Sequence, residues 1–198
     1  MSDAAHAQAI DPVEPAIETV YNGKLAMWLF LCSEVMFFSG LLGAYITLRT
    51  GDPSRFEASQ KHLHDHVWLA AINTLLLIAS SFTMAMAVQR GQQKQTGAQR
   101  MFLLMTAGLG IIFLLNKVYE YSTHIKVGQV PGTDIFFSFY YSLTGVHGFH
   151  ILAGVIPILG LWHYAGKQDV SKETEMVGLY WHFVDLVWIF LFPLLYLI

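Results

Sequence analysis

Two polar residues lie inside the apolar C-terminal end of the chain. The last twenty residues, LYWHFVDLVWIFLFPLLYLI, carry His182 and Asp185 three positions apart, which places both side chains on one face of a helix. An imidazole and a carboxyl at this spacing can form a hydrogen-bonded pair, and such a pair either holds a neighbouring helix or carries protons. Pro193 interrupts the last turns so close to the end that we expect the membrane interface to satisfy the freed carbonyl.

A second pair, His147 and His150 in TGVHGFHILAG, also shares one helical face. Two histidines at this spacing chelate a metal only if further ligands converge on them. The obvious candidates, Glu120 and the His182–Asp185 pair, belong to other apolar segments. A bis-histidine haem takes one axial ligand from each of two helices, and only three of the nine histidines lie well inside apolar segments. We therefore expect hydrogen bonds between helices at this pair, and no metal in this chain.

Two carboxyl groups also lie within apolar surroundings. Glu34 comes nine residues into the first apolar segment, about 14 Å from its start at roughly 1.5 Å per residue, and hence near the middle of a bilayer. A carboxyl at that depth stays protonated, faces water or is paired, and each state is costly enough to indicate a function; the alternative is a neutral Glu34 that hydrogen-bonds a neighbouring helix. Glu120, in NKVYEY, stands one turn from Lys117, which is compatible with an ion pair at the interface or with a buried role.

The remaining candidate groups lie outside the apolar segments or are single residues. His62, His64 and His66 alternate in HLHDHVW and would align in an extended segment, where they are either a surface metal site or a loop that titrates near neutrality. The single cysteine, Cys32, excludes an internal disulfide, a CxxC pair and a CxxCH haem-attachment site. We find no nucleophilic triad, phosphate-binding loop or dinucleotide fingerprint, so the sequence contains no catalytic constellation of its own.

Composition indicates that these residues are positioned by membrane-spanning helices. The chain is 55% hydrophobic and 13% charged, against about 25% charged residues in a soluble domain, and its mean hydropathy is +0.48. Five segments are long and apolar enough to cross a bilayer, at about 25–48, 67–88, 101–119, 135–164 and 177–198. The sequence therefore predicts an all-α fold: a polar N-terminal segment, 1–24, followed by one transmembrane domain, 25–198, built as a bundle of five helices.

Charge distribution limits the partners and favours one orientation. The net charge of −3 and the absence of a dense basic cluster argue against nucleic-acid binding. The acidic N-terminus lacks the pattern of a cleaved signal peptide. The connector RGQQKQTGAQR has three positive and no negative residues, which favours a cytoplasmic N-terminus. Its basic residues, Arg90, Lys94 and Arg100, are predicted to attract lipid phosphates.

Four passages together resemble one family. They follow the family's order: SEVMFFSG with Glu34, the YEY at Tyr119–Tyr121, SLTGVHGFHILAG with its two histidines, and YWHFVDLVWIFLFPLLYL with the C-terminal pair. From Lys24 to Ile198 the chain resembles subunit III of haem–copper terminal oxidases. Five spans correspond to the shorter bacterial form, because the seven-helix members carry two further helices before the SEV passage.

The resemblance implies a role for the chain. It implies an accessory subunit of a proton-pumping oxidase of aerobic respiration in the bacterial cytoplasmic membrane, with cytochrome c as electron donor. Haem and copper are then held by partner subunits, and dioxygen is reduced to water in subunit I. The family's subunit III packs against subunit I, binds phospholipid and supports proton uptake and stability. Glu34 matches the family's carbodiimide-reactive carboxyl, and the other intramembrane polar residues become hydrogen-bonding positions without a catalytic step: His147, His150, His182 and Asp185.

Other functions are compatible with parts of this pattern. The chain can be a quinol oxidase subunit III, or the related accessory subunit of a nitric oxide reductase. A proton-coupled transporter with Glu34 and Asp185 as relays is a further alternative. Transporters often show internal repeats and broken helices around a midplane site, and no repeat is evident here.

Overall fold

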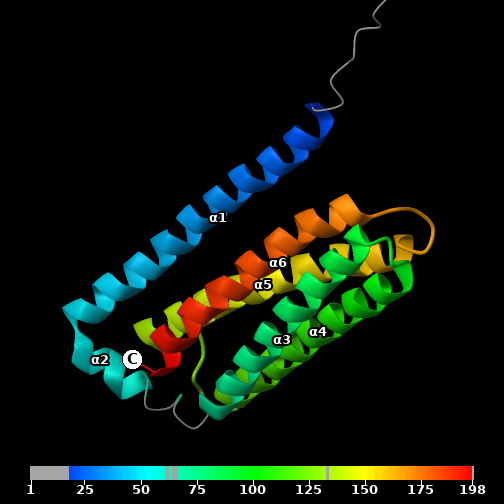
Figure 1. The fold of residues 1–198 in the computed structure, drawn as a ribbon. Helices are drawn as coiled ribbons and strands as arrows, with labels where there is room; N and C mark the ends of the chain where they lie inside the picture. The colour runs from blue at the N-terminus through cyan, green and yellow to red at the C-terminus, as the bar shows by residue number, and fades with distance from the viewer. Residues whose placement is uncertain (1–17, 61–62, 64–66, 133, 198) are drawn as a thin grey trace, which may run out of the picture.

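The computed structural model describes residues 18–60, 63, 67–132 and 134–197, and the elements within these ranges are helical (Figure 1). No strand occurs in the part of the chain that is described. In chain order the elements are α1 (Glu18–Gly51), α2 (Pro53–Gln60), α3 (Val67–Gln92), α4 (Thr96–Lys126), α5 (Ile135–Tyr164), α6 (Ser171–Phe192) and a closing π-helical turn, η2 (Pro193–Leu197).

Five of these helical segments can cross a membrane, which confirms the predicted all-α transmembrane fold. They are Gly23–Gly51, Val67–Gln92, Thr96–Lys126, Ile135–Tyr164 and Ser171–Leu197. Several helices extend past the apolar segments that predicted them, because hydropathy marks hydrocarbon depth, whereas a helix continues until its backbone is turned. Between α3 and α4 that turn occurs at Lys94, whose φ is 56°, and beyond α4 it occurs at Gly128, whose φ is 83°.

Helices α3 to α6 form the packed bundle, and α1 lies along one side of it (Figure 1). The short helix α2 turns back beneath α1, close to the C-terminal end of the chain. Only 11% of the most apolar window of α1 is buried within the chain, whereas the corresponding windows of the other four spans are 33–44% buried. The first span therefore exposes most of its apolar surface to lipid or to partners.

Two tryptophans of α6 form the centre of the bundle, and both are fully buried. A Cβ placed on Gly110 of α4 or on Gly154 of α5 would come within 2.7 Å or 2.8 Å of the Trp181 ring, so the indole needs a glycine on each neighbouring helix. The Trp181 indole N–H donates to Ser80 Oγ at 3.1 Å, and that of Trp188 donates to Thr74 Oγ1 at 3.0 Å. Both donors are thereby satisfied by α3.

Side chains of α1 and α2 hydrogen-bond the C-terminal turn of the chain. Gln60 Nε2 donates to the Leu195 carbonyl at 3.2 Å, and the Tyr45 hydroxyl donates to the Leu194 carbonyl at 3.4 Å. Pro193 has no N–H to continue the α-helix, and the chain closes in a π turn instead. The carbonyls of Leu194 and Leu195, which have no helical N–H beyond them, are thus satisfied by side chains of α1 and α2.

Candidate functional site

Glu34 of α1 and His150 of α5 lie together between two helices. Glu34 Oε2 and His150 Nε2 are 3.0 Å apart, and both side chains are mostly buried. His150 Nδ1 lies 2.8 Å from the Val146 carbonyl, which only accepts, so Nδ1 carries a proton. Nε2 then either accepts a proton from a neutral Glu34 or donates one as an imidazolium. In both states one proton lies between the two helices.

His147 occupies a different environment, although it is only one turn away. Its ring is fully buried, and neither nitrogen has a hydrogen-bond partner among the described residues. The ring stacks on Trp188 with centroids 5.2 Å apart, and it meets the edge of Phe113 at 5.7 Å. The interhelical hydrogen bond expected here is therefore absent for His147. The offset of about 60° between positions i and i+3 directs it toward α4 and α6, whereas His150 faces α1.

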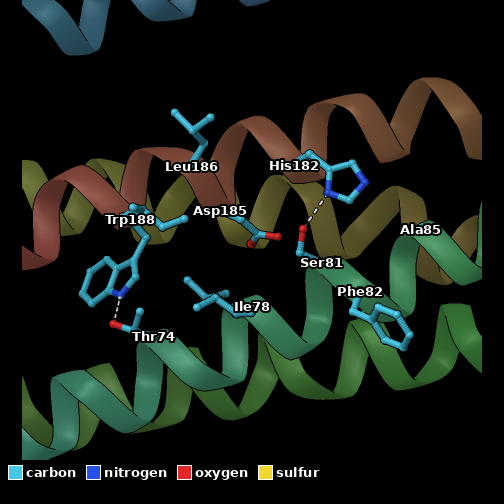
Figure 2. A pocket seen from close by; sticks show the side chains of 11 residues that line it. Thr74, Ile78, Ser81, Phe82, Ala85, His182, Asp185, Leu186 and Trp188 are labelled. Atoms are coloured by element: carbon cyan, nitrogen blue, oxygen red, sulfur yellow. Dashed lines mark hydrogen bonds between the residues drawn. The ribbon is translucent and has the colours of Figure 1, made fainter.

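His182 and Asp185 do not pair with each other. His182 Nδ1 lies 2.6 Å from the Ser81 hydroxyl of α3. The Asp185 residue is 5% exposed, and neither carboxyl oxygen has a hydrogen-bond partner in residues 18–60, 63, 67–132 and 134–197. Figure 2 shows this carboxyl directed from α6 toward α3, beside Ser81. Satisfaction by a neighbouring span is found for His182, and the Asp185 carboxyl interacts with the same Ser81 hydroxyl without a hydrogen bond of regular geometry.

Glu120 belongs to a buried cluster that joins three elements. Lys117 and Glu120 of α4 form an ion pair, Nζ to Oε2 at 3.0 Å. Lys117 is 5% exposed and Glu120 is 0% exposed. The hydroxyls of Tyr140 on α5 and Tyr196 on η2 both donate to Glu120 Oε1, the former at 2.6 Å. Lys117 Nζ also donates to Tyr196 at 2.6 Å and lies 4.8 Å from the centroid of the Trp188 ring.

The sequence left an interfacial and a buried ion pair open, and the structure shows the buried one. Tyr140 and Tyr196 were missed by sequence reasoning. A tyrosine near the end of a span is ordinary, so only the need of a buried carboxylate for donors could have indicated them.

The basic residues of the α3–α4 connection are only partly available to a ligand. Arg90 Nη1 donates to Gln95 Oε1 at 2.8 Å, and the Arg100 guanidinium lies 5.3 Å from the centroid of the Trp162 ring. Lys94 is exposed at the turn.

A polar pocket of about 350 Å³ lies beside this turn, against the α5–α6 connection. Lys94, Lys167 and Asp169 contribute to its lining. Asp169 accepts hydrogen bonds from the Ser171 hydroxyl at 2.5 Å and from its N–H at 3.0 Å, and these bonds hold the pKa of the carboxyl below its usual range. The pocket therefore carries charges of both signs.

Only one of the two candidate metal sites lies among the described residues. Among these residues, no three His, Cys, Asp or Glu side chains lie close enough together to hold a metal ion. His62, His64 and His66 lie outside the described residues.

Comparison with known proteins places the chain in a family. Residues 16–198 match the family model described as cytochrome c oxidase subunit III. The chain belongs to this family. It is 36% identical to cytochrome c oxidase subunit 3 of Thermostichus vulcanus over 179 residues, covering 88% of this chain and 86% of that protein. It is 32% identical to cytochrome c oxidase subunit 3 of Bacillus sp. strain PS3, with 94% and 92% covered. It is 30% identical to quinol oxidase subunit 3 of Bacillus spizizenii, with 100% and 97% covered.

Membership confirms the resemblance noted in the sequence. The chain is an accessory subunit III of a haem–copper oxidase, a multi-pass bacterial membrane protein that belongs to a complex with other oxidase subunits. The transporter alternative is not supported. The matched relatives include oxidases named for cytochrome c and for quinol.

Proposed function

We propose that the subunit carries no catalytic step and that it packs against subunit I, where bound haem and copper reduce dioxygen. One observation supports this role most directly. Three sets of intramembrane polar groups join helices of the chain to one another: Glu34 with His150, Ser81 with His182, and the Lys117–Glu120 cluster with its tyrosines. Side chains committed in this way fix helix packing.

Purification tests this role directly. The chain, affinity-tagged in its native membrane, is expected to co-purify with a haem-containing partner. After detergent separation the haem absorbance should stay with the partner. A separated chain that retains stoichiometric haem would overturn the proposal.

The electron donor proposed for the complex is cytochrome c. The family description and the T. vulcanus and PS3 relatives support it, whereas the B. spizizenii relative is named for quinol. The purified complex should oxidise reduced cytochrome c faster than a short-chain quinol at equal concentration. The reverse order would assign the complex to the quinol type.

Phospholipid is the proposed occupant of the groove between α1 and α6. This groove has a volume of about 530 Å³ and an almost wholly apolar lining that includes Trp28, Val35 and Phe183. An acyl chain fits such a lining, and the positive charges at the same end of the bundle, Arg90, Lys94 and Arg100, attract phosphate. Native mass spectrometry should detect retained phospholipid, and Lys94→Gln with Arg100→Gln should lower the anionic fraction. An unchanged lipid composition would remove these residues from the proposal.

Support of proton uptake is assigned to the Glu34–His150 pair, because one proton is shared between its two side chains.

The proposed orientation has the N-terminus in the cytoplasm, on the side of the basic α3–α4 turn. Cysteine labelling tests the orientation: in a Cys32→Ser background, Lys94→Cys should react with an impermeant maleimide in inverted vesicles and not in intact cells. The opposite pattern would reverse the orientation.

A further inference from the structure

Two lysines line the polar pocket between the α3–α4 turn and the α5–α6 connection. Within the described part of the chain, no carboxylate forms an ion pair with Lys94 or Lys167. Lys167 Nζ lies 2.9 Å from the Nε2 of an imidazole, that of His163. The Asp169 carboxyl, which also lines the pocket, is engaged by the hydroxyl and the N–H of Ser171. The pocket therefore presents two ammonium groups that can still take an anionic partner.

The surroundings of the pocket carry an excess of positive charge. The described residues of the two connections and the helix ends beside them include two acidic groups, Asp169 and Glu173, and five basic ones: Arg90, Lys94, Arg100, Lys167 and Lys172. Glu175, one turn further along α6, is paired with Lys24 at 2.8 Å. This end of the bundle thus has three more positive than negative charges, and such a field attracts an anion.

The segment that precedes α1 carries the opposite charge. Residues 1–17, which lie outside the described residues, contain Asp3, Asp11 and Glu14 and neither Lys nor Arg. Three carboxylates in this segment match the excess of three positive charges around the pocket.

The contact between α1 and α6 brings this segment close to the pocket. Lys24 Nζ donates to Glu175, one turn after Ser171, which lines the pocket. Figure 1 shows that α1 and α6 start at the same end of the molecule and run in the same direction. Asp11 lies seven residues before Glu18, where α1 begins, and seven extended residues span up to about 25 Å. That length exceeds the width of α6, about 10–12 Å with its side chains, so Asp11 can reach the pocket.

The same connection favours this segment over dissolved anions. Exposed ion pairs are individually weak, but a group held on a short tether acts at an effective concentration of the order of mM. The lining of the pocket is polar as well, with Thr96, Gln99 and Gln168 beside the lysines, so it accepts a carboxylate and not an acyl chain.

We infer that the acidic segment 1–17 of the chain docks on this pocket and places its carboxylates against Lys94 and Lys167. This contact lies within one chain, so it goes beyond the proposed function and does not depend on it. In this arrangement the segment competes with lipid phosphate for Lys94.

Amine labelling of the chain, purified with its native partners and held in phosphatidylcholine nanodiscs, tests the docking. In a variant with Asp3→Asn, Asp11→Asn and Glu14→Gln, an impermeant acetylating reagent should modify Lys94 and Lys167 about threefold faster than in the wild type. Lys172, which is at the same end but does not line the pocket, should change less, and exposed Lys126 of the opposite end should not change. In the wild type, about 1 M salt should produce the same gain, because it shortens the screening length to about 3 Å.

A water-soluble carbodiimide identifies the occupant, because it joins carboxylates to amines that they contact. Amide bonds between the segment and Lys94 or Lys167 of the same chain are expected. Equal labelling rates in the wild type and the variant would overturn the inference, as would bonds from the segment to another polypeptide alone. If anionic vesicles protect both lysines equally in the two proteins and phosphatidylcholine does not, the pocket belongs to a lipid phosphate and the inference fails.

Discussion

The buried Lys117–Glu120 pair gives the sharpest test of how this bundle is held together. Replacing Glu120 by Gln keeps the size of the side chain and an oxygen that can accept from Tyr140 and Tyr196. It removes the only charge that compensates the Lys117 ammonium within the described residues. Because only 5% of Lys117 is exposed, water cannot compensate its ammonium charge in place of the carboxylate. We expect Glu120→Gln to be strongly destabilising.

The expected magnitude follows from this burial. Removing one partner of a buried ion pair costs about 3–5 kcal/mol, since it leaves the other charge uncompensated. For a chain of this size 1 kcal/mol shifts the unfolding midpoint by about 2–4 °C, so the variant should unfold about 10 °C below the wild type. Replacing both residues, with Lys117→Met and Glu120→Leu, removes the charges together. The hydroxyls of Tyr140 and Tyr196, 3.2 Å apart, can still bond each other.

The double variant should therefore lie closer to the wild type than Glu120→Gln does. The midpoint is measured on the detergent-purified complex, as the loss of the intact species on size exclusion after heating. Two results would refute the reasoning: a Glu120→Gln midpoint equal to that of the wild type, or a double variant at least as unstable as the single one. Either would mean that packing, and not charge compensation, stabilises this cluster.

Two further predictions concern the other interhelical contacts. Glu34→Gln should leave the unfolding midpoint unchanged, because the amide can donate to His150 Nε2. Turnover-dependent inactivation of the oxidase should become faster. An unchanged inactivation rate would mean that the pair serves only in helix packing. Gly154→Ala places a Cβ 2.8 Å from Trp181 and should destabilise the protein by about 1–3 kcal/mol in the same thermal assay. Gly160→Ala, with no neighbour within 4 Å, is the control and should be neutral or slightly stabilising. Equal effects of the two substitutions would show that the Trp181 ring can move.

The fold could be predicted from the sequence because the bilayer imposes a length and a polarity on each span. The segment 135–164 was predicted with the bounds that α5 has in the structure, since a polar connector precedes it and an Ala-Gly-Lys connector follows. The bounds of α4 were less accessible. Its helix begins at Thr96 and continues to Lys126, because its polar ends keep backbone hydrogen bonds after they leave the hydrocarbon.

The sequence could predict that the intramembrane polar residues need partners, but not which residues those partners are. Glu34 and His150 are each recognisable as intramembrane polar groups that require a partner. Their contact joins positions 116 apart in sequence, so it depends on the packing of α1 against α5. His147 shows the same limit from the other side. A three-residue spacing suggested one common role for two histidines, and the helix surroundings gave one a carboxyl and the other an indole.

His182 and Asp185 show why spacing alone does not give the partners of polar residues. His182 bonds the Ser81 hydroxyl of α3. The Asp185 carboxyl lies beside the same hydroxyl, and its two oxygens are buried without a hydrogen bond of regular geometry. The three-residue spacing predicts that both side chains share one face of the helix, but it does not say which helix that face meets. That neighbour is set by the packing of α6 against α3, which the sequence of α6 alone does not specify.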